Sequence, residues 1–344
     1  MNLIIEAVSD APAGLLEGQC RYSAARLAPH RLVSAGADPR WDTRWTVARL
    51  DGRVVGAVTS HQPRTSRFVN DAYDLAAMAG SLGGAVPDDP RRWVFVGGCR
   101  DFAAGVVTSA QLPEQETAQV RSALAGHVFS EAEAAGDYPV ALYVREPEAG
   151  SFTAGLAGRG TAGELGETAE ILLVGADEEE HIAALRPSQR ERCRRDRRKF
   201  AALGYAARCV PAEEVLAEAA PLVCAVKAKY GVTDHPRLCE YRLREWATSV
   251  GAGKAHASEV RDGDGRLLAV SFMAVQGDVL EGYEIGLADE VEGREFAYLQ
   301  AMIHGPVRFA FAQGCRSIDL GLDSSTVKQR RGAVIGKTWA ISLA

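Results

Sequence analysis

Residues 317–325 read Ser-Ile-Asp-Leu-Gly-Leu-Asp-Ser-Ser, and after two further positions the chain continues as Lys328-Gln329-Arg330-Arg331-Gly332. The apolar residues at 318, 320 and 322 alternate with small or polar ones, which is typical of a buried strand. The loop that follows carries three cations: Lys328, Arg330 and Arg331. Arginine binds phosphate through paired hydrogen bonds and lysine binds it as a point charge. We therefore predict a phosphate-binding loop; a solvated turn that happens to be basic is the alternative.

Size and composition narrow the class of protein. The chain has 344 residues, is 47% apolar and 24% charged, and carries a formal net charge of −6. This length favours two domains, and the negative charge argues against a protein that coats nucleic acid, although a local basic site remains possible. The seven cysteines show no CxxC pair or other metal-ligand spacing, so we expect reduced thiols in the cytoplasm and no metal site. We also expect neither a membrane span nor a secretion signal, because the required apolar runs are absent.

The predicted elements follow the same order in both halves of the chain. In the first half, a hairpin turn at Asp51-Gly52 is followed by a helix over 117–136 and a strand over 139–145. In the second half, a hairpin turn at 262–265 is followed by a helix after Gly293 and then by the strand described above. The repeated order predicts two copies of one α/β unit. Between them, the glycine-rich residues 151–166 predict a flexible loop or lid.

A strongly basic helix is predicted early in the second half. Residues 190–199 contain seven basic and two acidic side chains on an otherwise acidic protein. Cations four positions apart lie on one helical face. The sequence therefore predicts an anion-binding face, although a solvated helix surface is the alternative. Arg190, Arg194 and Arg198 share one such face, and the residues of this helix assigned to phosphate binding are Arg194, Arg195, Arg198 and Lys199.

This arrangement resembles the tandem GNAT-type acyltransferases of the Fem family and its relatives. Those proteins attach amino acids to cell-wall precursors or small-molecule amines and take them from aminoacyl-tRNA. The resemblance rests on the basic helix ending at 195–204, on the hairpin, helix and strand of 255–322, and on the tail with Asp319-Leu320-Gly321, Lys328 and Arg331-Gly332. These places cover about the last half of the chain, whereas the first half matches only in the order of its elements.

The resemblance implies an α/β fold with two GNAT-like domains in tandem, each a mixed, mostly antiparallel sheet flanked by helices. The N-terminal domain would span 1–165, and the C-terminal domain, which includes the basic helix, would span 166–344. It also implies an acyltransferase that forms an amide or ester on a small-molecule amine or hydroxyl. Aminoacyl-tRNA would be its co-substrate, and no cofactor is expected.

One departure from the wider GNAT pattern concerns the donor. GNAT enzymes that use CoA carry a Gln/Arg-x-x-Gly-x-Gly/Ala loop, in which amides at a helix N-terminus hold the pyrophosphate. Neither 111–117 nor 289–294 fits that loop, and the latter reads Asp-Glu-Val-Glu-Gly-Arg, which is acidic. This favours a donor other than acetyl-CoA. An acyl-CoA-dependent N-acyltransferase is the alternative, and a non-catalytic RNA- or nucleotide-binding protein is the second alternative.

The resemblance also indicates where the chemistry takes place. In GNAT-like folds, amides at the opening between the two central strands meet the developing oxyanion. Here those strands are 279–287 and 318–322, so Tyr283, Glu284 and Asp323 are predicted nearest the carbonyl. Glu284 would accept the amine proton if burial raised its pKa; alternatively, Tyr283 and Glu284 only occupy opposite faces of a strand. Donor phosphates are assigned to Lys328, Arg330 and Arg331, and the acceptor to Tyr73 and Asp74 from the first domain.

Overall fold

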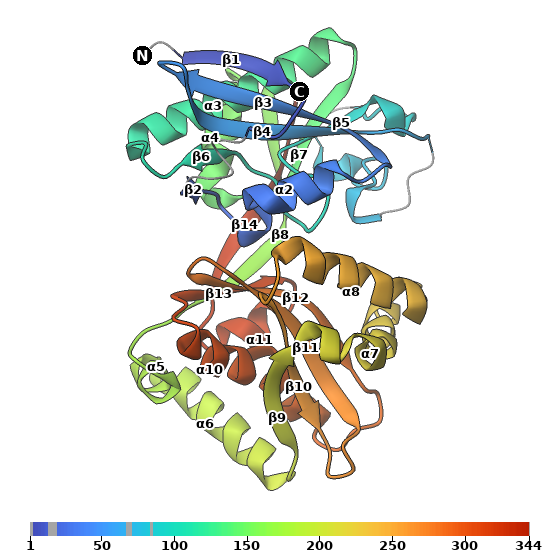
Figure 1. Ribbon diagram of the computed structural model, residues 1–344, viewed down its shortest axis with the longest axis vertical. Coiled ribbons are helices and arrows are strands. Elements are labelled where there is room, and N and C mark those ends of the chain that lie inside the picture. Colours follow the sequence, from blue (N-terminus) through green and yellow to red (C-terminus); the bar gives the residue numbers. More distant parts are fainter. Residues whose placement is uncertain (1–2, 13–18, 67–70, 83–84, 344) are drawn as a thin grey trace. The chain divides into compact units, whose positions relative to one another are not determined.

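The computed structural model describes residues 3–12, 19–66, 71–82 and 85–343 (Figure 1). The chain forms two compact units: Met1–Glu167 together with Gly336–Ala344, and Thr168–Ile335. The predicted boundary after residue 165 lies two residues before the observed one. The last nine residues, which the prediction assigned to the second domain, instead belong to the first unit.

The sheet of the first unit is mostly antiparallel. Its strand order is β1 (Leu3–Val8), β3 (Trp41–Leu50), β4 (Arg53–Pro63), β5 (Trp93–Val96), β7 (Tyr138–Arg145), β14 (Val334–Leu343) and the first part of β8 (Gly160–Leu172). The short strand β6 (Val107–Ser109) pairs with both β4 and β2 (Cys20–Arg21). Among the described pairs β1–β3, β3–β4, β4–β5, β4–β6, β2–β6, β5–β7 and β7–β14, only β5 and β7 are parallel.

The principal helix of the first unit is α3 (Glu114–Ala134), which covers this sheet. Its apolar residues recur at helical spacing, and Val120, Leu124 and Val128 pack into one core with residues of β4, β5 and β7. The unit also contains α2 (Pro29–Gly36) and α4 (Glu146–Gly155). Before β3, the described residues 19–36 form a short 3₁₀ turn (Ala25–Leu27) followed by α2, and residues 13–18 lie outside the described part.

The glycine-rich segment is not the flexible loop that we predicted from composition. Residues 151–155 complete α4, and residues from Gly160 onward form β8. Here glycine allows close backbone contact: a Cβ atom added at Gly163 would lie 2.1 Å from the carbonyl oxygen of Ser81. The small residues are therefore needed for packing.

The second unit has the same kind of sheet. The last part of β8 is followed in space by β13 (Ser317–Leu322), β12 (Val279–Leu287), β11 (Leu267–Gln276), β10 (Ala255–Arg261) and β9 (Ala206–Pro211). Only β12 and β13 are parallel among these described strands. In each unit the strands are mixed, mostly antiparallel and flanked by helices, which confirms the predicted fold class.

Helices cover both faces of this second sheet (Figure 1). Alternate residues of β11 show this division: Val270 and Phe272 share a core with α7 (Leu216–Ala228) and α8 (Pro236–Val250), whereas Met273 packs with the helices that follow β12. Those helices are α9 (Arg294–Leu299), a π-helical turn (Gln300–His304) and α10 (Gly305–Ala312). The π turn lies directly before Gly305-Pro306, where proline cannot donate a helical hydrogen bond.

The remaining helices of the second unit are α5 (Glu178–Ala184), α6 (Pro187–Ala202) and α11 (Ser325–Gln329). The helix α6 contains the basic segment, and α11 contains the first cation of the C-terminal basic loop. These two helices bring the predicted phosphate-binding residues into the same unit.

The parallel strands diverge differently in the two units. In the second unit, β12 and β13 pair only from Val279–Glu281 to Ser317–Asp319, which leaves their later residues apart. In the first unit, an additional bridge joins Ala104 to Val144 beyond the paired part of β5 and β7. The segment after β5 thus occupies the opening in the first unit. The corresponding opening in the second unit leads to a cavity.

Candidate active site

The main cavity of the second unit has a volume of about 650 Å³ and lies where β12 and β13 diverge. This volume suits a small-molecule or acyl group. Residues of three strands (β11, β12 and β13), of the helices α7, α9, α10 and α11, of the π-helical turn and of the adjoining loops line it. Four residues predicted from the sequence are brought together on its wall: Tyr283, Glu284, Asp323 and Lys328.

A second cavity of about 440 Å³ adjoins the first. The basic residues on its wall are Arg192, Arg195 and Lys199 from α6 and Arg330 and Arg331 beyond α11. Three further residues, Glu295, Tyr298 and Val327, line both cavities. Two basic elements separated by more than a hundred positions in sequence therefore meet beside the opening between the strands.

The face of α6 that lines the second cavity differs from the predicted one. Arg195 and Lys199 are on the wall, but Arg194 and Arg198 are not among the lining residues, and Arg198 instead pairs with Glu191 at 2.8 Å. Arg192, which the prediction missed, is on the wall. Positions 192, 195 and 199 follow the i, i+3, i+7 spacing of one helical face, so this periodicity was the available signal.

A buried ion pair holds the second basic element onto α6. The Nε atom of Arg331 donates to Oδ2 of Asp196 at 2.7 Å, while Nη2 of Arg195 contacts Oδ1 at 3.2 Å. Burial alone would raise the pKa of Asp196, but His304, whose Nε2 lies 3.9 Å away, and the hydrogen-bonded Arg331 outweigh it and lower the pKa to about 2. Arg331 therefore has a structural role in addition to its place on the cavity wall.

Lys328 is buried with its ammonium at the end of β13. Its Nζ donates to the carbonyl oxygens of Leu320 at 2.9 Å and Leu322 at 2.6 Å, and the side chain is 3% exposed. The next residue after this strand, Asp323, has a left-handed backbone (φ 58°) and is exposed. Lys328 thus places a fixed positive charge on the wall of the main cavity, behind the strand end.

A β-bulge explains how Tyr283 and Glu284 both reach the main cavity. Between Ser271 and Met273 of β11, the partners on β12 advance from Ile285 to Gly282, so β12 contains one extra residue there. A bulge changes the direction of neighbouring side chains. The sequence alternative, in which the two residues lie on opposite faces of a regular strand, therefore does not describe this place.

The contacts of these two side chains differ. The ring of Tyr283 stacks on Trp246 with centroids 4.6 Å apart and planes at 1°. Glu284 pairs with Nζ of Lys227 at 3.0 Å and with Nε of Arg242 at 3.4 Å. Glu284 is thus held on the cavity wall as an ion-paired carboxylate, whose oxygens can accept a hydrogen bond from an amine or hydroxyl of an acceptor.

Tyr298 is a candidate that the sequence analysis missed. It lies on α9 and contributes to the walls of both cavities. Burial raises the pKa of its phenol, which a hydrogen bond with Ser324 opposes only in part. The hydroxyl is therefore neutral at physiological pH and able to donate a hydrogen bond. In the sequence it belongs to an ordinary apolar helix pattern, which gave no signal.

The two residues of the first domain that were predicted to bind the acceptor form hydrogen bonds with backbone amides of their own unit. Tyr73 is 1% exposed, and its hydroxyl accepts a hydrogen bond from the Phe102 amide at 2.9 Å. The Oδ1 atom of Asp74 accepts from the amide of Ala76 at 3.0 Å and so stabilises a turn. Neither residue is on the wall of the two cavities.

The loop before α9 exposes several carboxylates on the surface. Asp289 pairs with Lys229 and lies 3.7 Å from Arg294, while Glu290 and Glu292 are exposed. In a GNAT enzyme that uses CoA, this loop would face the pyrophosphate. The carboxylates here would repel such a group, which agrees with the departure noted in the sequence.

The family comparison assigns most of the second unit. Residues 187–329 match the family model described as the acetyltransferase (GNAT) domain. No curated protein matches the sequence. The matched residues include α6, the strands β9 to β13 and all of α11, so they contain the walls of the main cavity.

Solved structures with the same fold extend over both units. FemX is similar with a TM-score of 0.61 and 11% identity, over 98% of this chain and 97% of that chain. A tandem GNAT protein from the clavulanic acid biosynthesis pathway has a TM-score of 0.54 and 13% identity, over 100% and 98%. L-PGS from Bacillus licheniformis has a TM-score of 0.51 and 8% identity, over 84% and 81%. These likenesses confirm the predicted resemblance to tandem GNAT and Fem-like proteins at the level of the fold. Within the described residues, no helix is both long and apolar enough to cross a membrane.

Proposed function

We propose that this chain, an acyltransferase whose second unit carries the GNAT domain, transfers an aminoacyl group from aminoacyl-tRNA to an amine or hydroxyl of a small molecule. The observation that carries the proposal is the meeting of two basic elements in a cavity that adjoins the opening between β12 and β13. A donor with an ester at one end and phosphates beside it fits this pair of cavities.

The charge distribution favours tRNA over CoA. The acidic residues Asp289, Glu290 and Glu292 lie in the loop where CoA pyrophosphate would bind. The basic residues lie instead along α6, and Arg194 and Arg198 continue the positive surface beyond the second cavity. A polynucleotide has phosphates for such an extended surface. The resemblance to the Fem family implies the same donor.

The main cavity supplies groups for acyl transfer. The acceptor amine would approach Glu284 and attack the ester carbonyl at the strand opening, where backbone amides and the nearby Lys328 charge stabilise the oxyanion. The C–N bond then forms as the ester C–O bond breaks. The amine gives its proton to the Glu284 carboxylate, and the hydroxyl of Tyr298, between the two cavities, is placed to donate a proton to the ribose oxygen. Proton exchange with solvent then returns Glu284 and Tyr298 to their starting forms, so the step yields an amide and a free ribose hydroxyl.

The second candidate is transfer from an acyl-CoA. The match to a family of acetyltransferases favours it, and the cations of the second cavity could hold CoA phosphates. A non-catalytic RNA-binding role is less favoured, because it gives no purpose to the polar groups of the main cavity.

A donor assay distinguishes these functions. The purified protein is incubated with a mixed amine acceptor pool and, in parallel, with tRNA charged with each labelled amino acid or with labelled acetyl-CoA. We expect label to pass from at least one aminoacyl-tRNA to a small-molecule product, with Lys328→Met as the impaired control. Transfer only from acetyl-CoA would establish the second candidate, and binding of tRNA without transfer would favour the non-catalytic role.

A further inference from the structure

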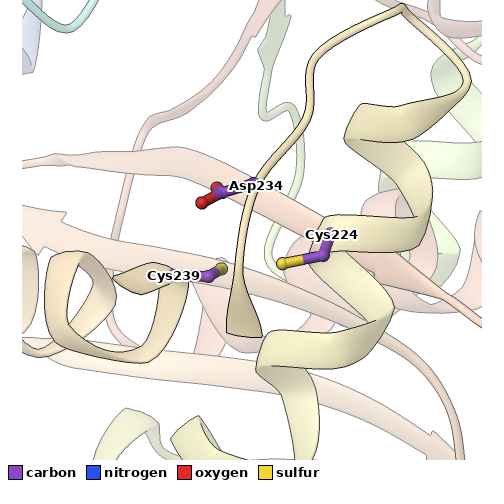
Figure 2. A group of neighbouring side chains, drawn as sticks. All are labelled: Cys224, Asp234 and Cys239. Atoms are coloured by element: carbon purple, nitrogen blue, oxygen red, sulfur yellow. The ribbon is translucent and has the colours of Figure 1, made fainter. Parts of the chain in front are cut away.

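Two cysteines and an aspartate converge at the corner between α7 and α8, away from the basic cavity. Cys224 lies on α7, Cys239 on α8 and Asp234 in the connection between them. Their sulfur and carboxylate oxygen atoms all lie within 4.8 Å of one another. Figure 2 shows the two sulfur atoms pointing toward each other, with the Asp234 carboxylate above them. Fifteen positions separate the cysteines, so the sequence showed no metal-ligand spacing.

The fold fixes all three side chains. The packing of α7 against α8 brings the cysteines together, and Cys239 is fully buried whereas Cys224 is partly exposed. The Oδ1 atom of Asp234 accepts from the amide of His235 at 2.9 Å, which holds the carboxylate at the beginning of α8. A ligand could therefore enter from the side of Cys224 and Asp234.

We propose that Cys224, Cys239 and Asp234 bind one thiophilic divalent cation, of which Zn²⁺ is the best fit. Zinc accepts thiolate and carboxylate ligands in a tetrahedral arrangement, with sulfur at about 2.3 Å and oxygen at about 2.0–2.2 Å. Two sulfurs on one such ion lie roughly 3.8 Å apart, so the observed cluster needs only small side-chain rotations. The fourth position would hold water. This site is independent of the identity of the acyl donor.

An ion at this cluster would share the aspartate with two cations. Lys227 and Arg242 contact Oδ2 of Asp234 at 3.4 and 2.8 Å, and both also contact Glu284. Burial, reinforced by the Glu284 charge, raises the pKa of Cys239 to about 12, and burial together with Asp234 raises that of Cys224. Both thiols are therefore protonated before the ion binds. One divalent ion would replace two protons, so the net charge of the cluster is unchanged.

The site is connected to the wall of the main cavity. Lys227 and Arg242 lie between Asp234 and Glu284 and pair with both carboxylates. When an ion binds Asp234, the two cations would pair more fully with Glu284. The ion would thus stabilise the α7–α8 corner and orient the carboxylate that we assign to the acceptor.

The test uses Co²⁺ as a visible probe for the thiolate ligands. Full-length protein is stripped with a chelator under reducing conditions and titrated with Co²⁺, while absorbance and proton release are recorded. We expect one ion per chain, a thiolate-to-cobalt absorption band and the release of two protons. Zn²⁺ should displace the bound Co²⁺ and raise the melting temperature.

Matched variants assign the ligands. Cys224→Ser is chosen because this residue is only partly buried, and Cys209→Ser is the control because Cys209 is also partly buried and lies on β9 of the same unit. We expect Cys224→Ser to lose the band, Asp234→Asn to bind at least tenfold more weakly, and Cys209→Ser to match the wild type. The proposal is overturned if the reduced wild type gives no band, or if the band persists in Cys224→Ser.

Discussion

Replacing the two α6 cations of the second cavity should weaken donor binding and its dependence on salt. The variant is Arg195→Ala with Lys199→Ala, and the control is Arg194→Ala with Arg198→Ala. Both pairs remove two positive charges from one helix, but only the first pair lines the cavity. The comparison therefore separates contact at the cavity from the general field of the helix.

The expected size of the loss in donor binding follows from the exposure of the substituted side chains. The Arg195 side chain is 48% exposed, so each lost contact is worth about 0.2–1 kcal/mol, as for exposed ion pairs. The donor KM should rise roughly 2- to 30-fold for the pair. Each phosphate contact to a single strand contributes about 0.7 to the slope of log affinity against log salt, so the slope should flatten by about 1.4.

The assay is steady-state kinetics with aminoacyl-tRNA between about 50 and 200 mM salt. Arg195 also contacts Asp196, so the melting temperature of each variant is measured, and Lys199→Ala alone serves as a second comparison. Equal changes in donor KM and salt slope for the two double variants would show that the donor responds only to the overall positive charge of the helix. If neither pair changes KM or slope, α6 is a solvated surface and the reasoning about the second cavity is wrong.

Three further predictions concern the buried charges. Lys328→Met removes the ammonium at the end of β13 and should lower kcat roughly 5- to 150-fold without altering the salt slope; an unchanged kcat would remove this residue from the mechanism. Glu284→Gln should raise the acceptor KM roughly 10- to 150-fold and leave the donor KM unchanged, and the opposite pattern would contradict its assignment to the acceptor. Asp196→Asn leaves the buried Arg331 without its charged partner and should lower the free energy of unfolding by about 3–5 kcal/mol in urea titrations at neutral pH. Because the pKa of Asp196 in the folded protein is lowered to about 2, this stabilisation is complete above about pH 4 and is lost as the pH falls through 2. A difference in the free energy of unfolding between wild type and Asp196→Asn that stays constant from about pH 4 to pH 2 would refute the role of the ion pair.

The repeated unit could be predicted because its signals are local. The turn at Asp51-Gly52 has the two positive φ angles, 50° and 79°, that a tight hairpin requires. The alternation of 318, 320 and 322 likewise gave β13 correctly. The placement of β14 was not predictable in this way, since its pairing with β7 joins the end of the chain to the first unit and depends on contacts distant in sequence.

The sequence predicted which types of residue form the candidate site better than it predicted how they are arranged in space. The basic run correctly indicated α6, but its cavity face depends on how Asp196 and Arg331 fix the rotation of the helix. The bulge at Tyr283 and Glu284 arises from the register of β11 and β12, which a single strand does not reveal. The Cys224–Cys239 contact similarly requires α7 and α8 to be packed together.

The most direct test of the account is a crystal structure with a stable analogue of the aminoacylated tRNA end, in which an amide replaces the ester. The account predicts the aminoacyl carbonyl at the opening between β12 and β13, beside Lys328 and Tyr298, and phosphates against Arg195, Lys199 and Arg330. Density for the phosphates at the acidic loop 289–292, or for the aminoacyl group in the first unit, would contradict it.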